Sequence, residues 1–329
     1  MSIIHIIRKR MSFFGYTYKL CFLLFHLHII FFLCYNADME RYLKYKITEK
    51  YDGERVLTFL KEEIEASARL IRHLKNIPDG ITCNGEHIRT VDILHSGDLL
   101  CIHLPEQKDH KHTIVDPMPY DLTILYEDDD LLIVDKPAGL PLHPSHNHQG
   151  DTLANAVSYY LQQHGKEAVF RSVGRLDRGT SGVVICALNK YTAARLSGKV
   201  YKEYYAVCEG IYEGEGVIDK PIYRPDPILT IRTVDPRGEQ AITEWKAVSN
   251  HNGRTLLHIH LVTGRTHQIR VHFSSMGTPL TGDTMYGTAR DDISRQALHC
   301  CYCRFNHPVT NEEIEVSSPL PDDIAQFVK

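Results

Sequence analysis

The spacing of apolar residues predicts a small α/β domain over residues 39–105. One helical pattern begins at 55–60. A second runs from Ser67 to Leu74, with Leu70, Ile71 and Leu74 on one face. Three short apolar pieces separated by Asn-Gly and Gly-Asp turns then predict strands, at 81–83, 88–91 and 99–104.

A longer set of apolar runs predicts a second domain over residues 118–329. Strands are predicted at 122–126, 131–134, 183–187, 204–208, 241–248 and 256–262. Helices are predicted at 153–161, at 193–196 and after Thr263-Gly264, where Ile269, Phe273 and Met276 share a face and Thr266 can cap the helix. Because strands dominate and most connections read as hairpins, we expect an α+β fold on a mostly antiparallel sheet.

The first 38 residues differ from the rest of the chain. Four cations (Arg8, Lys9, Arg10 and Lys19) precede an apolar run from Leu20 to Cys34. This layout is typical of a signal peptide or signal anchor, although the run is short for a membrane span. A third interpretation is a start codon assigned too early, with Met39 as the true first residue. The polar, Pro-containing segment 106–117 is predicted to be a linker.

Composition narrows the function. The 329 residues are 43% hydrophobic with a formal net charge of −4, which argues against a disordered chain or a multi-span membrane protein. No global basic field is present, so any nucleic-acid site must be a local patch. Nine cysteines are too few for a disulfide scaffold and indicate a reducing, cytoplasmic compartment.

Common cofactor and metal motifs are absent from the sequence. It contains no phosphate-binding P-loop, no G-x-G-x-x-G and no H-E-x-x-H. Two groups could chelate a metal, one at His143, His146 and His148 and one at His299, Cys300, Cys301 and Cys303. Neither group has the distant matching pair that structural zinc sites use. We therefore expect neither a metal nor a cofactor.

Three segments carry candidate chemistry. Asp177 lies between Arg175 and Arg178 on a loop before a buried strand, where a carboxylate kept ionised could act as nucleophile or base. Arg270 is predicted on a helix at the edge of the core, where it could pair with a carboxylate. Tyr204 adjoins Tyr205 on a strand, so one ring could line a cleft. For each residue taken alone, a purely structural role is the commoner interpretation.

The small domain resembles the S4-type RNA-binding module. The resemblance rests on SARLIRHLK, TCNGEHIRT and HSGDLLCIHLP, over roughly residues 53–104. It implies that Arg69, Arg72 and Lys75, spaced three apart along one helix side, contact RNA phosphates.

The larger domain resembles the RluA-like pseudouridine synthases. The resemblance rests on GRLDRGTSG, the K-x-Y-x-A run at 202–206 and TGRTHQIRVH, supported by DKPAGLPLHP and GDTMYG. Two departures from the family pattern flank the aspartate. Gly174 stands where many members have His, and Gly179 stands where many have Asp. These departures put substrate preference or local geometry in doubt more than activity.

The resemblance assigns roles to four residues. Asp177 is the implied catalytic carboxylate, Tyr204 packs against a flipped uracil, and Arg270 pairs with Asp177. Arg175 is implied to fill the space that the flipped nucleotide leaves in the RNA, or to contact the RNA phosphates.

The expected function is isomerisation of specific uridines to pseudouridine in structured RNA, either ribosomal or transfer RNA. The enzyme is expected to need no cofactor and no protein partner, and to meet a membrane only if residues 1–38 anchor it. The alternative is a non-catalytic RNA-binding or assembly factor on the same scaffold.

Overall fold

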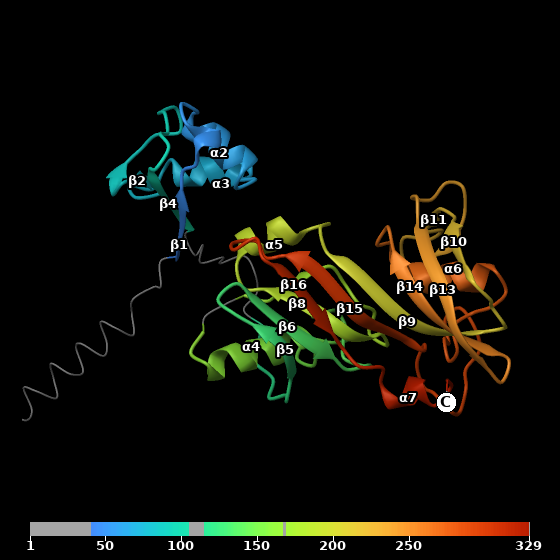
Figure 1. Ribbon diagram of the computed structural model, residues 1–329. Helices are drawn as coiled ribbons and strands as arrows, with labels where there is room; N and C mark the ends of the chain where they lie inside the picture. The colour runs from blue at the N-terminus through green and yellow to red at the C-terminus, as the bar shows by residue number, and fades with distance from the viewer. Residues whose placement is uncertain (1–40, 105–114, 167–168, 329) are drawn as a thin grey trace, which may run out of the picture. The chain divides into compact units, whose positions relative to one another are not determined.

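The computed structural model describes residues 41–104, 115–166 and 169–328. The predicted N-terminal extension at 1–38 and most of the predicted linker at 106–117 lie outside the described residues. The chain divides into two compact units, Met1–Lys108 and Asp109–Lys329. Each unit is built around its own sheet (Figure 1).

The first unit is a four-stranded antiparallel sheet, in the order β1-β4-β2-β3, with two short helices. Its elements are β1 (Arg41–Lys46), the 3-10 helix η1 (Glu49–Tyr51), α2 (Val56–Glu62), α3 (Ala68–Leu74), β2 (Ile81–Cys83), β3 (Glu86–His87) and β4 (Leu99–Leu104). Ser67 caps α3 by accepting a hydrogen bond from the Leu70 amide. The predicted helices and two of the three predicted strands are present.

The strand predicted at 88–91 is wrong. The chain turns at Asn84 and Gly85, both with positive φ, and pairs Glu86–His87 with β2 instead. A two-residue turn fixes the register of the strand that follows immediately. The apolar residues at 88–91 therefore come after the strand, and Val91 is exposed.

Over its described residues, the second unit contains a long ten-stranded sheet, a separate two-stranded sheet formed by its two shortest strands, and four helices. Its strands are β5 (Thr123–Glu127), β6 (Leu131–Lys136), β7 (Arg171–Val173), β8 (Ser181–Ala187), β9 (Tyr201–Glu209), β10 (Glu215–Asp219), β11 (Ile222–Tyr223), β12 (Thr233–Val234), β13 (Ile242–His251), β14 (Arg254–Leu261), β15 (Leu298–Asn306) and β16 (Glu313–Ser317). Its helices are α4 (Leu153–Gln163), α5 (Lys190–Leu196), α6 (Gln268–Ser275) and α7 (Asp322–Ala325).

The long sheet runs in the order β10-β13-β14-β9-β15-β8-β6-β5, with β16 added to β15 and β7 to β8 (Figure 1). Its pairs are antiparallel except for β15 and β8, which run parallel. The α+β fold and the mostly antiparallel sheet are confirmed. The parallel pair matters because it joins the two halves of the sheet next to the start of β8.

The parallel pair requires a glycine at position 182. A Cβ placed on Gly182 would lie 2.1 Å from the carbonyl oxygen of Cys300 on β15, and its φ is +110°. Any side chain would force the two strands apart. Gly182 thus lets β8 approach β15 closely.

Helix α6 begins differently from the prediction. Its N-cap is His267, in the left-handed region at φ 59° and ψ 20°, and not Thr266. At its other end Met276 is 40% exposed, whereas Ile269 and Phe273 are buried. The helix has ended by Met276, because Gly277 takes a positive φ just beyond it.

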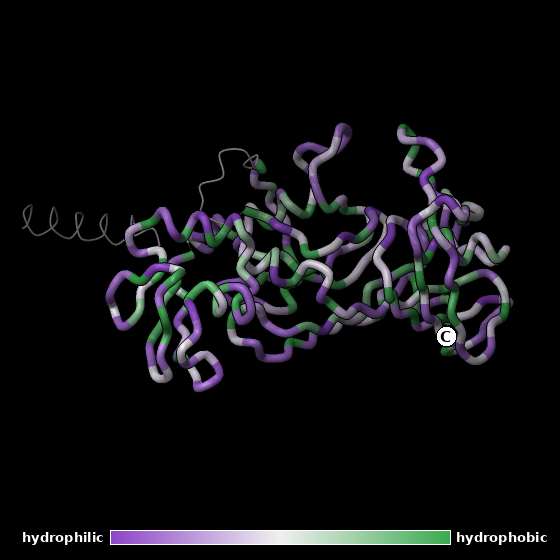
Figure 2. The backbone as a smooth tube through the Cα atoms, turned by 90° about the horizontal axis from the view of Figure 1, so that it is seen from above, coloured by the Kyte–Doolittle hydropathy of each residue, from purple (hydrophilic) through white to green (hydrophobic). Residues whose placement is uncertain are grey.

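The core of the second unit is formed by the inward residues of the central strands, and β8 is buried along its whole length. Apolar and polar stretches alternate along the backbone (Figure 2), as half-buried strands require. Among the described residues, no helix combines the length and apolar character needed to cross a bilayer.

Candidate active site

Three elements bring the predicted site residues together. Asp177 lies on the loop between β7 and β8, Tyr204 on β9 and Arg270 on α6. The strand β15 connects two of them, since Cys300 lies opposite Tyr204 on one side and opposite Gly182 on the other. The sheet order therefore holds the aspartate loop beside the tyrosine.

A single guanidinium links two carboxylates in this site. Arg270 Nη1 donates to Asp177 Oδ2 at 3.0 Å, while Arg270 Nε and Nη2 donate to the two oxygens of Asp283 at 2.7 and 2.9 Å. Burial acts to lower the pKa of Arg270, but the bonds and charges of Asp283 and Asp177 outweigh it and raise that pKa. Arg270 is permanently cationic and rigidly held.

Asp283 is a site residue that the prediction missed. It is completely buried and also accepts the backbone N–H groups of Met285 and Tyr286. The motif GDTMYG, which contains it, was noted only as part of a resemblance. Nothing in the spacing of 270 and 283 indicated a two-point bond, because a loop of unknown path separates them.

Asp177 itself is partly enclosed, with 15% of its side chain exposed. Oδ2 is taken by Arg270, whereas Oδ1 lies 3.7 Å from Nε2 of His267, outside hydrogen-bond range. The carboxylate is thus anchored through one oxygen, while the other has no hydrogen-bond partner among the described residues.

Tyr204 is buried, and its hydroxyl contacts the Cys300 thiol. Burial raises the pKa of Tyr204 well above the ordinary value of 10, with further contributions from Cys300 and from the negative charge of Asp177. The phenol is therefore neutral, and it lies close enough to Asp177 for the negative charge of the carboxylate to contribute to this rise in pKa.

The aspartate loop is held by two buried side chains from other parts of the chain. Lys136 is fully buried and donates to the carbonyls of Pro137, Leu140 and Arg178 at 2.8, 2.9 and 3.1 Å. Arg295 donates to the Gly179 carbonyl at 3.2 Å. Burial lowers the pKa of Lys136 to about 7, helped by Arg295 and opposed by Asp177.

The two arginines beside Asp177 do not hold it. Both are exposed, and Arg178 Nε donates to the Gly139 carbonyl at 3.0 Å. Arg175 is thus available at the surface of the loop. The cation that pairs with the carboxylate comes from α6 instead.

Each of the two glycines that depart from the family pattern faces a polar side chain. A Cβ at Gly174 would lie 3.4 Å from Lys202 Nζ, and Gly174 has a φ of +80°. A Cβ at Gly179 would lie 2.5 Å from Gln296 Oε1. The loop is therefore fitted to glycine at both positions.

The predicted RNA-binding cations of the first unit, Arg69, Arg72 and Lys75, are all exposed. Arg72 and Lys75 line a hollow of about 390 Å³ together with Lys61, over apolar residues of α2 and α3. Arg69 does not line it.

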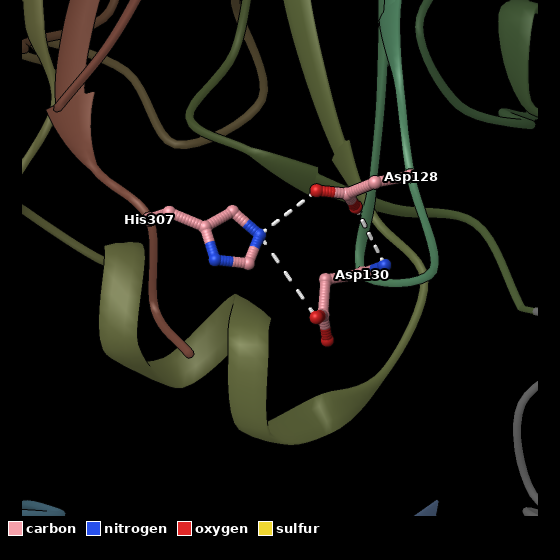
Figure 3. A group of neighbouring side chains, drawn as sticks. All are labelled: Asp128, Asp130 and His307. Atoms are coloured by element: carbon pink, nitrogen blue, oxygen red, sulfur yellow. Dashed lines mark hydrogen bonds and ion pairs between the residues drawn. The ribbon is translucent and has the colours of Figure 1, made fainter. Parts of the chain in front are cut away.

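One further group has the composition of a metal site. Asp128, Asp130 and His307 place one ligand atom each within 4.8 Å of one another (Figure 3). His307 Nδ1, however, accepts the backbone N–H groups of Val309 and Thr310 at 3.3 and 3.1 Å. The neutral ring must then carry its proton on Nε2, the nitrogen that faces the carboxylates, and a protonated nitrogen cannot bind a metal.

Three of the histidines considered as metal ligands hydrogen-bond other side chains. His143 bonds Ser172 Oγ, His148 bonds Asp151 and His299 bonds Ser181 Oγ, at 2.8, 2.6 and 2.9 Å respectively. Cys300 and Cys303 are free thiols in the core.

Comparison with known proteins indicates the same family that the sequence motifs resemble. Residues 130–275 match the RNA pseudouridylate synthase family. A Bacillus subtilis protein, "Uncharacterized RNA pseudouridine synthase YjbO", is 38% identical over 81% of this chain and 96% of its own length. The Vibrio cholerae "Ribosomal large subunit pseudouridine synthase D" is 36% identical over 63% of this chain and 69% of its own length. "Human RNA Pseudouridylate Synthase Domain Containing 1" is 28% identical and covers 61% of this chain and 86% of its own, with a TM-score of 0.50.

The long sheet and the matched sequences define an isomerase that acts on RNA. The chain belongs to the RNA pseudouridine synthase family.

Proposed function

We propose that Asp177 is the group that performs the isomerisation. Pseudouridine formation breaks the N1–C1′ bond, turns the uracil and joins C5 to C1′. The reaction needs an ionised oxygen beside the ribose, to attack C1′ or to remove the C2′ proton. The observation that carries the proposal is that Asp177 is bound by Arg270 through Oδ2 alone, which leaves Oδ1 for the nucleotide.

Arg270 keeps the carboxylate charged and fixed in direction. Asp283 holds the other edge of the guanidinium, so the pair cannot slide into a two-point bond that would occupy both oxygens of Asp177. Tyr204, neutral and buried, supplies a ring face for the extruded uracil. Arg175, exposed on the same loop, fills the space that the base leaves in the RNA or contacts a phosphate.

The substrate is a uridine in structured RNA, ribosomal or transfer. The relatives that are named for the ribosomal large subunit favour the ribosomal one. The first unit serves as an S4-like RNA-binding domain whose exposed Arg69, Arg72 and Lys75 neutralise phosphates. We place the enzyme in the cytoplasm, where its RNA and the free thiols of the described residues belong.

The test is the release of tritium from RNA that carries 5-tritiated uridine. Asp177→Asn keeps the shape but not the charge, and is expected to lower the single-turnover rate by more than about 1,000-fold. RNA affinity should stay within about twofold of the unaltered protein.

Asp291→Asn, an exposed aspartate outside the site, is the matched control and should keep the full rate. Tyr204→Phe tests the hydroxyl separately from the ring, and is expected to bind RNA but turn it over poorly. An Asp177→Asn variant that releases tritium at the normal rate would eliminate the assignment.

A further inference from the structure

The residue that begins α6 has a left-handed backbone conformation that residues other than glycine adopt uncommonly, although asparagine, aspartate and histidine are enriched among those that do. His267 lies at φ 59° and ψ 20°, and its side chain is only 9% exposed. It makes no capping hydrogen bond to the helix. Unfavourable backbone conformations of this kind persist only where surrounding contacts impose them, and they gather at active sites.

Tyr286 determines which nitrogen of His267 carries the proton. The Tyr286 hydroxyl accepts the backbone N–H of Arg232 at 2.9 Å and lies 2.8 Å from His267 Nδ1. Among the hydrogen bonds of the described residues, the phenol proton has no other acceptor. The phenol therefore donates to Nδ1, and the ring proton of a neutral His267 is on Nε2.

The protonated nitrogen faces the reacting carboxylate without binding it. His267 Nε2 lies 3.7 Å from Asp177 Oδ1, the oxygen that Arg270 does not use. A donor and an acceptor thus lie side by side, 3.7 Å apart, too far to bond each other. A substrate atom between them would meet both.

A neutral donor suits this position better than a cation. Burial lowers the pKa of His267, and the charges of Arg270, Arg175 and Arg232 add to that effect against the opposing charge of Asp177. A protonated imidazole would pair with Asp177 and reduce its basicity. The neutral ring leaves the carboxylate free.

We propose that His267 is a further catalytic residue that donates the Nε2 hydrogen bond to a carbonyl oxygen of the flipped uracil, and that Tyr286 is its positioning residue. This inference rests on Asp177 being the reacting carboxylate. When the N1–C1′ bond breaks, its electron pair stays with the base and the carbonyl oxygens gain negative charge. His267 stabilises that charge without transferring a proton, and the base is held while C5 turns toward C1′.

The experiment separates the donor from the backbone conformation. His267→Asn suits the left-handed conformation but has an amide too short to reach the nucleotide. It should fold with an unchanged melting temperature and lose roughly 30- to 100-fold in single-turnover tritium release, with RNA affinity within about threefold. His267→Gln carries an N–H at about the position of Nε2 and should recover most of the rate.

Tyr286→Phe keeps the ring that packs 5.1 Å from the Arg270 guanidinium but removes the hydroxyl. It should lose roughly 3- to 10-fold in rate, since the ring proton of His267 is no longer fixed. A His267→Asn variant with normal turnover overturns the proposal. So does a stable His267→Gln variant as slow as His267→Asn, because that result assigns His267 a purely structural role.

Asp177→Asn is measured in parallel. If it is active, the proposed site is wrong as a whole. If Asp177→Asn is inactive while His267→Asn is fully active, the role proposed for His267 is wrong and the assignment of Asp177 stands.

Discussion

Two regions of the catalytic unit combine aspartate with histidine, and they differ in how the protein surrounds the carboxylate oxygens. At Asp177, one oxygen binds Arg270 and the other has no hydrogen-bond partner among the described residues. At Asp130, Oδ1 accepts bonds from Asn189 and Thr192 at 2.7 and 3.0 Å, and Oδ2 lies 3.9 Å from Nε2 of His307.

At the neighbouring Asp128, both oxygens accept hydrogen bonds. Oδ1 accepts the amide of Asp130 (Figure 3) and that of Leu131, and Oδ2 accepts the hydroxyl of Tyr126 at 2.8 Å. We call Asp128, Asp130 and His307 the closed cluster. The comparison indicates that Asp128, whose protein partners occupy both oxygens, is a structural element, whereas Asp177 keeps one acceptor oxygen without a protein donor among the described residues.

After the loss expected for Asp177→Asn itself, the next largest effect on this comparison comes from removing the carboxylate that keeps Arg270 in place. In Asp283→Asn, the guanidinium of Arg270 is free to turn and bind both oxygens of Asp177. No oxygen of Asp177 would then be left for the nucleotide. We expect single-turnover tritium release to fall roughly 10- to 100-fold with RNA affinity unchanged.

Asp292→Asn, which breaks an exposed pair with Arg290, is the control and should be as active as the unaltered protein. An unchanged rate in Asp283→Asn would mean that Arg270 does not need its second carboxylate.

A substitution in the closed cluster should change the stability of the protein and not its catalytic rate. Asp130→Asn places an amide against the donors of Asn189 and Thr192, and should lower the free energy of unfolding in urea by about 1–3 kcal/mol. The rate per folded molecule should not change.

Asp121→Asn, an exposed aspartate, controls for the loss of one charge. The comparison breaks if Asp130→Asn loses activity on the scale expected for Asp177→Asn.

As the pH falls, the stability of the fold should decrease first through the protonation of buried histidines, and only at lower pH through the protonation of carboxylates. Burial lowers the pKa of His272 and of His299 from the ordinary value of 6.5. Between the lowered folded pKa and 6.5, the unfolded chain binds more protons than the folded chain. Stability therefore falls as the pH drops below about 6.5.

We expect a loss on the order of 1 kcal/mol between pH 7 and pH 5, measured by urea unfolding. His299→Gln should flatten the curve. A curve with no slope in this range in the unaltered protein would contradict the assignment of these rings as neutral.

The smallest expected effect is that of zinc on the closed cluster. Because Nδ1 of His307 accepts two amides, Nε2 keeps its proton and the cluster should not bind the ion. Zinc and chelator should each leave the melting temperature and the rate unchanged, in the unaltered protein and in His307→Gln alike. A zinc-dependent rise in melting temperature that His307→Gln abolishes would reverse this conclusion.

The sequence predicted most of the catalytic architecture because its signals are local. Apolar runs identified six strands of the long sheet, namely β5, β6, β8, β9, β13 and β14. The other strands of this unit were missed, both the short strands β7, β10, β11, β12 and β16 and the nine-residue β15, whose histidine and cysteines were considered as metal ligands. Their pairing depends on partners far along the chain.

The candidate site was predicted in part. Asp177, Tyr204 and Arg270 were named from motifs. Their separation in the chain left it open whether Arg270 or the adjacent arginines would hold the aspartate. Asp283 could not be found from residue type, since a buried aspartate on a loop becomes informative only when its partner is seen. The capping role of Thr266 failed for a related reason, because contacts of His267 outside the helix decide where α6 begins.

The close approach at Gly182 constrains anyone who wishes to retarget this enzyme. A Cβ at position 182 would lie only 2.1 Å from the Cys300 carbonyl oxygen. Library members in which Gly182 is replaced would therefore fail to pair β8 with β15 correctly. Variation is better confined to positions 175 and 178, whose side chains already point to solvent. New RNA contacts could then be selected there without disturbing the seam between β8 and β15.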